Sequence, residues 1–320
     1  MNRLRFAYNT NGCSNHRLDD ALELIAEAGF DGVALTLDWH HLDPFAPGWN
    51  VAAARLRRRL GELGLGVVIE TGARYLLDPR HKHEPTLLHP TPEGRARRRA
   101  FLKRAADIAA QVEAEAVSFW AGVPQPGVAR GDAEGWLHEG LADVLAYADG
   151  LGVTMAFEPE PGMLIETVAE YAALAEHHPA LMLALDTGHC LVTGDIEPED
   201  AVRAYAGRLG TVAIEGMRRG DHTHLPLDEG DMDLPAVLRA LAEVGFSGLV
   251  CVELSRESPR AHAAIPQAIE QIRAALARGP LPRPGEVAGQ GNAGGGAAAA
   301  PMQPPALRAT SPARGVGPGA

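Results

Sequence analysis

Residues 183–190 read LALDTGHC, which places an acid and an imidazole directly after an apolar run. Short apolar runs that end in a glycine-containing turn are typical of buried strands, and Gly188 supplies that turn. Asp186 and His189 would therefore lie at the carboxyl end of a strand. An aspartate before Thr-Gly also commonly caps a following helix, so the rest of the chain has to decide between a structural and a chemical role.

Stretches of the same kind recur along the chain. The eight strand candidates are residues 5–9, 32–38, 66–72, 116–122, 153–160, 181–188, 211–216 and 249–255. Between them lie stretches whose apolar residues recur at three- and four-residue steps, as expected of amphipathic helices: residues 17–30, 97–114, 137–152, 167–178 and 234–246. Strand followed by helix, repeated, predicts a parallel sheet.

Two closures can complete such a repeat: an open doubly wound sheet or an eight-stranded barrel. An open sheet gathers its ligands at one switch point, whereas a barrel brings all its carboxyl ends around one mouth. Residues capable of chemistry follow every expected strand: Asn9 and Asn11, Asp38 and His40, Glu70, Trp120, Glu158 and Glu160, Asp186 and His189, Glu215, and Glu253. No Gly-x-Gly-x-x-Gly motif follows the first strand. We therefore predict an α/β protein whose residues 1–278 form a (β/α)8 TIM barrel.

The composition changes at the end of this repeat. Residues 279–320 have Pro, Gly and Ala in excess and almost no apolar periodicity, so we predict a disordered low-complexity tail. The net charge of -12 argues against nucleic-acid binding. The three cysteines are far apart and odd in number, which favours a reducing compartment, and no apolar leader or membrane-spanning run is evident. We expect a cytoplasmic protein with no membrane partner, and its oligomeric state is left open.

Three of the acidic residues share one context. Glu158, Asp186 and Glu253 each end an apolar strand in the second half of the expected barrel. Three carboxylates at neighbouring strand ends would repel one another without a cation. Oxygen and imidazole ligands suit Mn2+ or Mg2+, with Zn2+ or Co2+ as alternatives, and carboxylates beside such an ion can also move protons. The pattern predicts a site for a divalent metal.

The motifs around these acids resemble those of a known family. FEPEPG (157–162), LDTGH (185–189) and the run from residue 228 to 254 are similar to the xylose isomerase-like barrels, which include sugar phosphate isomerases and epimerases and also apurinic endonucleases. The resemblance implies one metal held by a glutamate after strand five, an aspartate after strand six, a histidine after strand seven and a glutamate after strand eight. Glu158, Asp186 and Glu253 match three of these positions. It further implies that the two glutamates transfer protons, and that His189 contacts substrate or a further metal.

The expected histidine is missing from the seventh strand. This strand reads TVAIEGM, with Ala213 at the position of the family's metal-binding histidine. Glu215 lies two residues further on the same face, and the GDHTHLP stretch offers His222 and His224. The fourth metal ligand could therefore be His222, His224, Glu215 or water, and the sequence does not choose among them.

Other residues are candidates for binding the substrate. Residues 73–94 form an unusually long connection rich in Arg, Lys and His, as expected of a lid that lends cations to an acidic mouth. Arginines after the last two strands are placed where many barrels bind phosphate. The substrate-binding candidates are His189, Glu215, Arg218, Arg219, Arg256, Glu70, His40 and Trp120.

The residues together favour one function over two others. We expect a metal-dependent isomerase or epimerase of a small sugar, sugar acid or sugar phosphate, with proton transfer by Glu158 and Glu253 through an enediolate. Ala213 leaves open a barrel that binds a metabolite without catalysis. An apurinic endonuclease-like phosphodiesterase is the third alternative, which the acidic composition disfavours.

Overall fold

A closed barrel of eight parallel strands forms the centre of the protein, as a computed structural model of residues 3–278 shows. Around the barrel, each strand pairs with its neighbours in the order β1, β2, β3, β4, β5, β6, β7, β10 and back to β1. The strands are β1 (Arg5–Asn9), β2 (Gly32–Thr36), β3 (Gly66–Glu70), β4 (Val117–Phe119), β5 (Met155–Phe157), β6 (Met182–Asp186), β7 (Leu209–Ile214) and β10 (Leu249–Val252). The predicted (β/α)8 barrel is confirmed.

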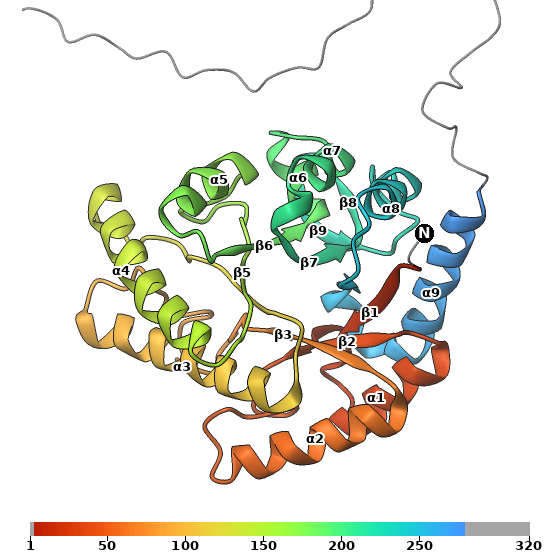
Figure 1. The fold of residues 1–320 in the computed structure, drawn as a ribbon, viewed down its shortest axis with the longest axis horizontal. Coiled ribbons are helices and arrows are strands. Elements are labelled where there is room, and N and C mark those ends of the chain that lie inside the picture. The colour runs from red at the N-terminus through yellow and green to blue at the C-terminus, as the bar shows by residue number, and fades with distance from the viewer. Residues whose placement is uncertain (1–2, 279–320) are drawn as a thin grey trace, which may run out of the picture. The chain divides into compact units, whose positions relative to one another are not determined.

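Helices surround the barrel on its outside (Figure 1). They are α1 (Leu18–Ala28), α2 (Trp49–Leu63), α3 (Pro92–Val112), α4 (Arg130–Asp149), α5 (Val168–His177), α6 (Thr187–Thr193), α7 (Pro198–Ala204), α8 (Leu234–Glu243) and α9 (Ala261–Ala277). Their ends follow local chemistry: the Thr167 side chain caps α5 in a reciprocal pair with Glu170, and α1 stops at Gly29, whose φ is 89°. The last helix, α9, packs against the first, α1, and this contact closes the ring of helices around the barrel.

Small side chains fill the inside of the barrel. The interior clusters consist of Ala7, Ala34, Val68, Leu249 and Cys251, and of Ala116, Ala156 and Ala184. Larger residues on the alternate positions of the same strands, such as Phe119, Phe157 and Val250, face the helices in the main core. Because side chains alternate with a period of two, Glu70 and Asp186 continue the inward-facing rows and emerge at the carboxyl end of the barrel.

A short hairpin follows the seventh strand of the barrel, where the sequence indicated a loop. Strands β8 (Gly216–Arg218) and β9 (Asp221–Leu225) pair in antiparallel fashion and pack against α6. Gly220 makes the tight turn with a φ of 73°. The hairpin brings a histidine-bearing strand back over the barrel mouth.

Two further predictions concern the connection from β3 to α3 and the residues after 278. The connection from β3 to α3 is long, as expected, and contains no helix or strand in residues 71–91. The predicted low-complexity tail, residues 279–320, lies outside the described residues. Within residues 3–278, no helix is both long and apolar enough to cross a bilayer.

Candidate metal centre and active site

The carboxyl ends of the strands open into a cavity of ≈ 490 Å³. Its wall combines carboxylates and imidazoles with a few cations and hydroxyls: Asn11, Ser14, Glu70, Gly72, Arg74, Lys82, His83, Trp120, Glu158, Glu160, Met163, His189, His222, His224, Glu253, Ser255 and Ser258. A cavity of this size and polarity at the carboxyl end of a TIM barrel is the usual place for a ligand.

The three predicted metal-binding carboxylates converge at the base of this mouth. Glu158, Asp186 and Glu253 all line a small cavity of ≈ 30 Å³ inside the barrel, and Ala213 lines it too. Nδ2 of Asn11 donates to Oε1 of Glu253 at 2.8 Å, which fixes the orientation of that carboxylate. The small methyl group of Ala213 therefore occupies the position from which a longer side chain would point at the three acids.

Glu215 adds a fourth carboxylate to the group. Its side chain is fully buried, and neither Oε1 nor Oε2 has a hydrogen-bond partner. Oδ2 of Asp186 is buried and makes no hydrogen bond, with Nε2 of His189 3.5 Å away, whereas Oδ1 of Asp186 accepts a hydrogen bond from the backbone amide of His189 at 3.1 Å. Buried acceptors without partners are costly, so this arrangement is what a cation would satisfy.

The electrostatics of the group agree with this geometry. Burial raises the pKa of Glu158 well above its usual value, and the neighbouring charges of Glu160 and Glu253 raise it further. Burial and then Asp186 do the same to the pKa of Glu215. Burial alone would raise the pKa of Asp186, but His189, Glu215 and His224 together outweigh it and lower this pKa to about 2. Burial and mutual repulsion thus disfavour the ionised form of Glu158 and Glu215, and a bound divalent ion would favour it.

His224 comes close to the inner carboxylates from the hairpin. A ring nitrogen of His224 and carboxylate oxygens of Asp186 and Glu215 all lie within 4.8 Å of one another. Nδ1 of His224 is buried and has no hydrogen-bond partner. The hairpin therefore places an imidazole beside the acids although the strand itself carries Ala213.

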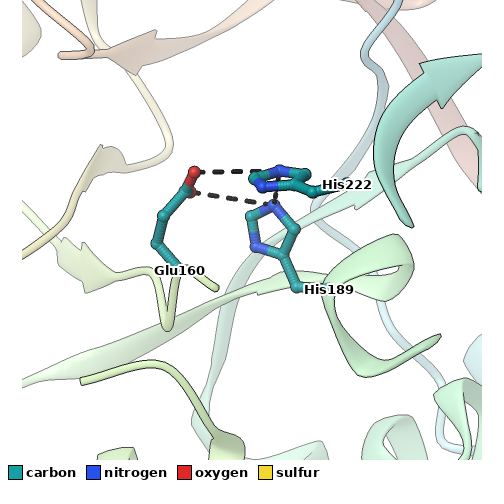
Figure 2. A group of neighbouring side chains, drawn as sticks. All are labelled: Glu160, His189 and His222. Carbon is teal, nitrogen blue, oxygen red and sulfur yellow. Dashed lines mark hydrogen bonds and ion pairs between the residues drawn. The ribbon is translucent and has the colours of Figure 1, made fainter. Parts of the chain in front are cut away.

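His189 connects the inner carboxylates to a second cluster, which we call the outer cluster, because its Nδ1 lies 3.8 Å from Oε1 of Glu158 and its Nε2 lies 3.5 Å from Oδ2 of Asp186. Figure 2 shows the carboxylate of Glu160 facing the rings of His189 and His222. Nε2 of His189 is 3.1 Å from Nε2 of His222 and 3.7 Å from Oε2 of Glu160, and Nε2 of His222 is 3.8 Å from Oε1 of Glu160. Nδ1 of His189 lies 3.0 Å from the carbonyl oxygen of Pro159, which suits an Nδ1 proton and leaves Nε2 to face the cavity.

Comparison with known proteins places this arrangement in a family. The sequence pattern described as xylose isomerase-like TIM barrel matches residues 22–275. The chain belongs to the xylose isomerase-like TIM barrel family. No curated protein sequence is significantly similar to the chain.

Solved structures of this family share the fold. A structure of L-ribulose 3-epimerase is 23% identical with a TM-score of 0.68, covering 86% of this chain and 95% of that one. D-allulose 3-epimerase from Methylomonas sp., in complex with D-allulose, is 20% identical with a TM-score of 0.66, covering 86% and 98%. An IolI protein with a bound zinc atom is 17% identical with a TM-score of 0.69, covering 85% and 98%.

Some of the predicted substrate-binding residues line the cavity and others do not. Glu70 and Trp120 line the cavity, and Trp120 also stacks on the guanidinium of the buried Arg98 at 4.3 Å. His40 lies outside the cavity lining, with Nδ1 4.0 Å from Oδ2 of Asp38. The three arginines after the last strands are exposed and do not line the cavity: Arg218, Arg219, which pairs with Glu197, and Arg256.

Several residues of the mouth had no metal-binding, catalytic or substrate-binding role assigned from the sequence. Glu160 was recognisable in principle, because it follows Glu158 by two residues and so shares its side of the extended chain. Asn11 belongs to the polar NTNG run after the first strand. Arg74 and Lys82 belong to the long cationic connection, but no spacing rule distinguishes them from its other Arg, Lys and His residues.

Proposed function

We propose that this chain is a divalent-metal-dependent isomerase or epimerase of a small sugar, sugar acid or sugar phosphate. The observation that carries the proposal is the group of acids at the base of the mouth. Glu158, Asp186 and Glu253 line one small cavity, and Glu215, beside Asp186 and His224, has two buried oxygens without a hydrogen-bond partner. Structural neighbours whose names are those of sugar epimerases support the same class of reaction.

The residues present fit a divalent cation. The unpartnered atoms are Oδ2 of Asp186, both Oε atoms of Glu215 and Nδ1 of His224, all of which are donors that such an ion accepts. We assign Glu158, Asp186 and Glu253 as metal ligands, with His224 in place of the histidine absent at Ala213. Glu215, which shares a group with Asp186 and His224, would contribute to the same site. When bound, the cation would polarise a substrate carbonyl and lower the energy of the enediolate.

We assign proton transfer to Glu158 and Glu253, two glutamates of the cavity lining. Glu158 and Glu253 are mostly buried and line the space that a substrate would occupy. Burial raises the pKa of both carboxyl groups in the metal-free protein, and their position in the cavity lining places them within reach of a substrate proton. Asn11 holds the carboxylate of Glu253, while Oγ of Ser118 approaches Oε2 of Glu158 at 3.4 Å.

The outer cluster would orient the substrate. Nε2 of His189 and the carboxylate of Glu160 face the cavity together and can exchange hydrogen bonds with substrate hydroxyl groups. Trp120 and Met163 supply the less polar part of the lining. The neighbours' sugar ligand, D-allulose, is the kind of polyhydroxy compound that such a wall suits.

The test is metal analysis followed by isotope exchange. The purified protein should contain a divalent metal, and the metal-loaded protein should exchange one substrate C–H proton with solvent deuterium for a member of a ketose, aldose and sugar-phosphate panel. A protein that binds metal and panel sugars but exchanges no proton would instead be a metabolite-binding barrel.

A further inference from the structure

The lining of the mouth carries cations as well as acids. Carboxylates and imidazoles gather around the proposed metal site, whereas the cations of the cavity lining come from the β3–α3 connection. Among the described residues that line the cavity, Arg74 and Lys82 are the only Arg and Lys side chains. The hydroxyl group of Ser14 lies beside Arg74, and we call Arg74, Lys82 and Ser14 the cationic wall.

Arg74 is not neutralised by an ion pair. Its Nη1 donates to Oγ of Ser14 at 2.9 Å and its Nη2 donates to the carbonyl oxygen of Asn11 at 3.3 Å, both neutral acceptors. Within residues 3–278, Arg74 forms no salt bridge, although its charge opposes the burial that raises the pKa of Glu70 and Glu253 in the same cavity. A guanidinium has five N–H donors, so donors remain for a ligand.

Lys82 likewise keeps its charge available. Its side chain is exposed, lines the cavity, and makes no hydrogen bond or ion pair within the described part of the chain. By contrast, Arg219 binds Glu197 at 2.7 Å, and Arg203 binds Glu243 at 3.1 Å. The two cations without carboxylate partners thus lie where a ligand would enter.

The backbone fixes Arg74 in this position. The connection folds onto itself because the amide of His83 donates to the carbonyl oxygen of Arg74 at 2.6 Å, and Nδ1 of His83 lies 2.6 Å from the carbonyl oxygen of Gly72. The ring of His83 in turn packs edge-on against Trp120. Arg74 is therefore held in the wall by its surroundings rather than left to move in solvent.

We propose that the substrate carries one anionic group, a carboxylate or a phosphate, that binds Arg74 and Lys82. This inference rests on the proposed function and narrows its substrate class. The acidic side of the mouth would repel such a group, so the anion faces the cationic wall and the reacting carbonyl end faces Glu158 and Glu253. A neutral sugar would leave the two cations without a partner. Guanidinium and ammonium groups bind both kinds of anion.

Calorimetric titration of the Mn2+-loaded protein with three probes tests the inference: D-fructose, D-fructuronate and D-fructose 6-phosphate. We expect at least tenfold tighter binding of one anionic probe than of D-fructose, and the tighter anion identifies carboxylate or phosphate as the source. Arg74→Met and Lys82→Met should each remove most of this preference, with Arg74→Lys retaining part of it. The matched control is Arg80→Met, which removes an exposed cation from the same connection outside the cavity lining.

Two results would overturn the inference. One is equal affinity of the wild type for the neutral and anionic probes, including no measurable binding of either anion at millimolar concentration. The other is an equal loss of anion binding in Arg80→Met, which would indicate a general charge effect. Isotope exchange distinguishes a failure of this inference from a failure of the proposed function. Substrate exchange without a preference for anions would contradict only the anion site. A preference for anions without exchange on any panel compound would contradict only the proposed catalysis.

Discussion

The carboxylate of Glu215 lies directly against the Cα atom of Gly188, so that a Cβ atom on this glycine would be 2.0 Å from Oε1 of Glu215. The glycine of the DTGH motif therefore makes room for a buried acid directly after β7. Gly188→Ala should displace Glu215 and weaken Mn2+ binding about tenfold, which corresponds to ~1.4 kcal/mol, as measured by calorimetry. Gly61→Ala is the control, since a Cβ atom there meets nothing within 4 Å. Unchanged Mn2+ affinity in Gly188→Ala would show that Glu215 does not contribute to the site.

Glu158 and Glu253 carry the proton transfer in this account. Glu158→Gln and Glu253→Gln should each lower the rate of substrate C–H exchange with deuterium by roughly 10²- to 10⁴-fold, because an amide cannot accept the proton. Nuclear magnetic resonance of the substrate measures the exchange at saturating Mn2+, so that a loss of metal is not mistaken for a loss of the base. Glu243→Gln, on the exposed face of α8, should exchange at the wild-type rate. Normal exchange in either active-site variant would remove that residue from the mechanism.

His222 should act on substrate rather than on the inner metal. Its Nε2 contacts His189 and Glu160 in the outer cluster, not the inner carboxylates. We expect His222→Ala to keep Mn2+ affinity within about threefold of wild type while raising KM. Metal analysis at equilibrium provides the second readout: one ion per chain is expected. Two ions in wild type and one in His222→Ala would instead make the outer cluster a second metal site.

The stability of the fold should fall as the solution becomes acidic, in part because of His41. Burial, and then the neighbouring His40, lowers the pKa of His41 to about 4, whereas an unfolded histidine titrates near 6.5. Between pH 7.5 and pH 5, the unfolded chain takes up a proton at this residue and the folded chain does not, so the free energy of unfolding decreases as pH falls. Because the ring is partly exposed, we expect a contribution of about 1 kcal/mol.

Urea unfolding of the metal-free protein at the two pH values measures this contribution. Wild type should lose more stability between pH 7.5 and pH 5 than His41→Gln, which cannot titrate. His81→Gln is the control, since His81 is an exposed histidine. An identical pH dependence of wild type and His41→Gln would contradict the assignment.

The sequence predicted the barrel because its signals are local and repeated. Each of the eight strands lies at its predicted place, since apolar runs and turn residues alternate with regular helical periodicity. The inner carboxylates were also predictable, because Glu158, Asp186 and Glu253 directly follow or end strands of one sheet. Parallel topology then brings them together without any further information.

The rest of the site depends on contacts that local patterns do not encode. The β8–β9 hairpin has only 3 and 5 residues in its strands, too few for a clear alternation, so the sequence could not choose between His222 and His224. The cationic wall depends on the path of a connection without helix or strand. Phosphate binding was expected at Arg218, Arg219 and Arg256 because of where barrels often place it, yet their side chains lie outside the cavity lining.

The central claim is that His224 replaces the histidine missing at Ala213 in a divalent metal site with Glu158, Asp186 and Glu253. Titration of Mn2+ into wild type, His224→Ala and the double variant His224→Ala/Ala213→His tests it most directly, with Asp186→Asn as the reference for a lost ligand. Our account predicts that His224→Ala weakens Mn2+ binding at least tenfold, and that Ala213→His restores much of the loss because Ala213 lines the same small cavity as the three acids. Wild-type Mn2+ affinity in His224→Ala would contradict the account.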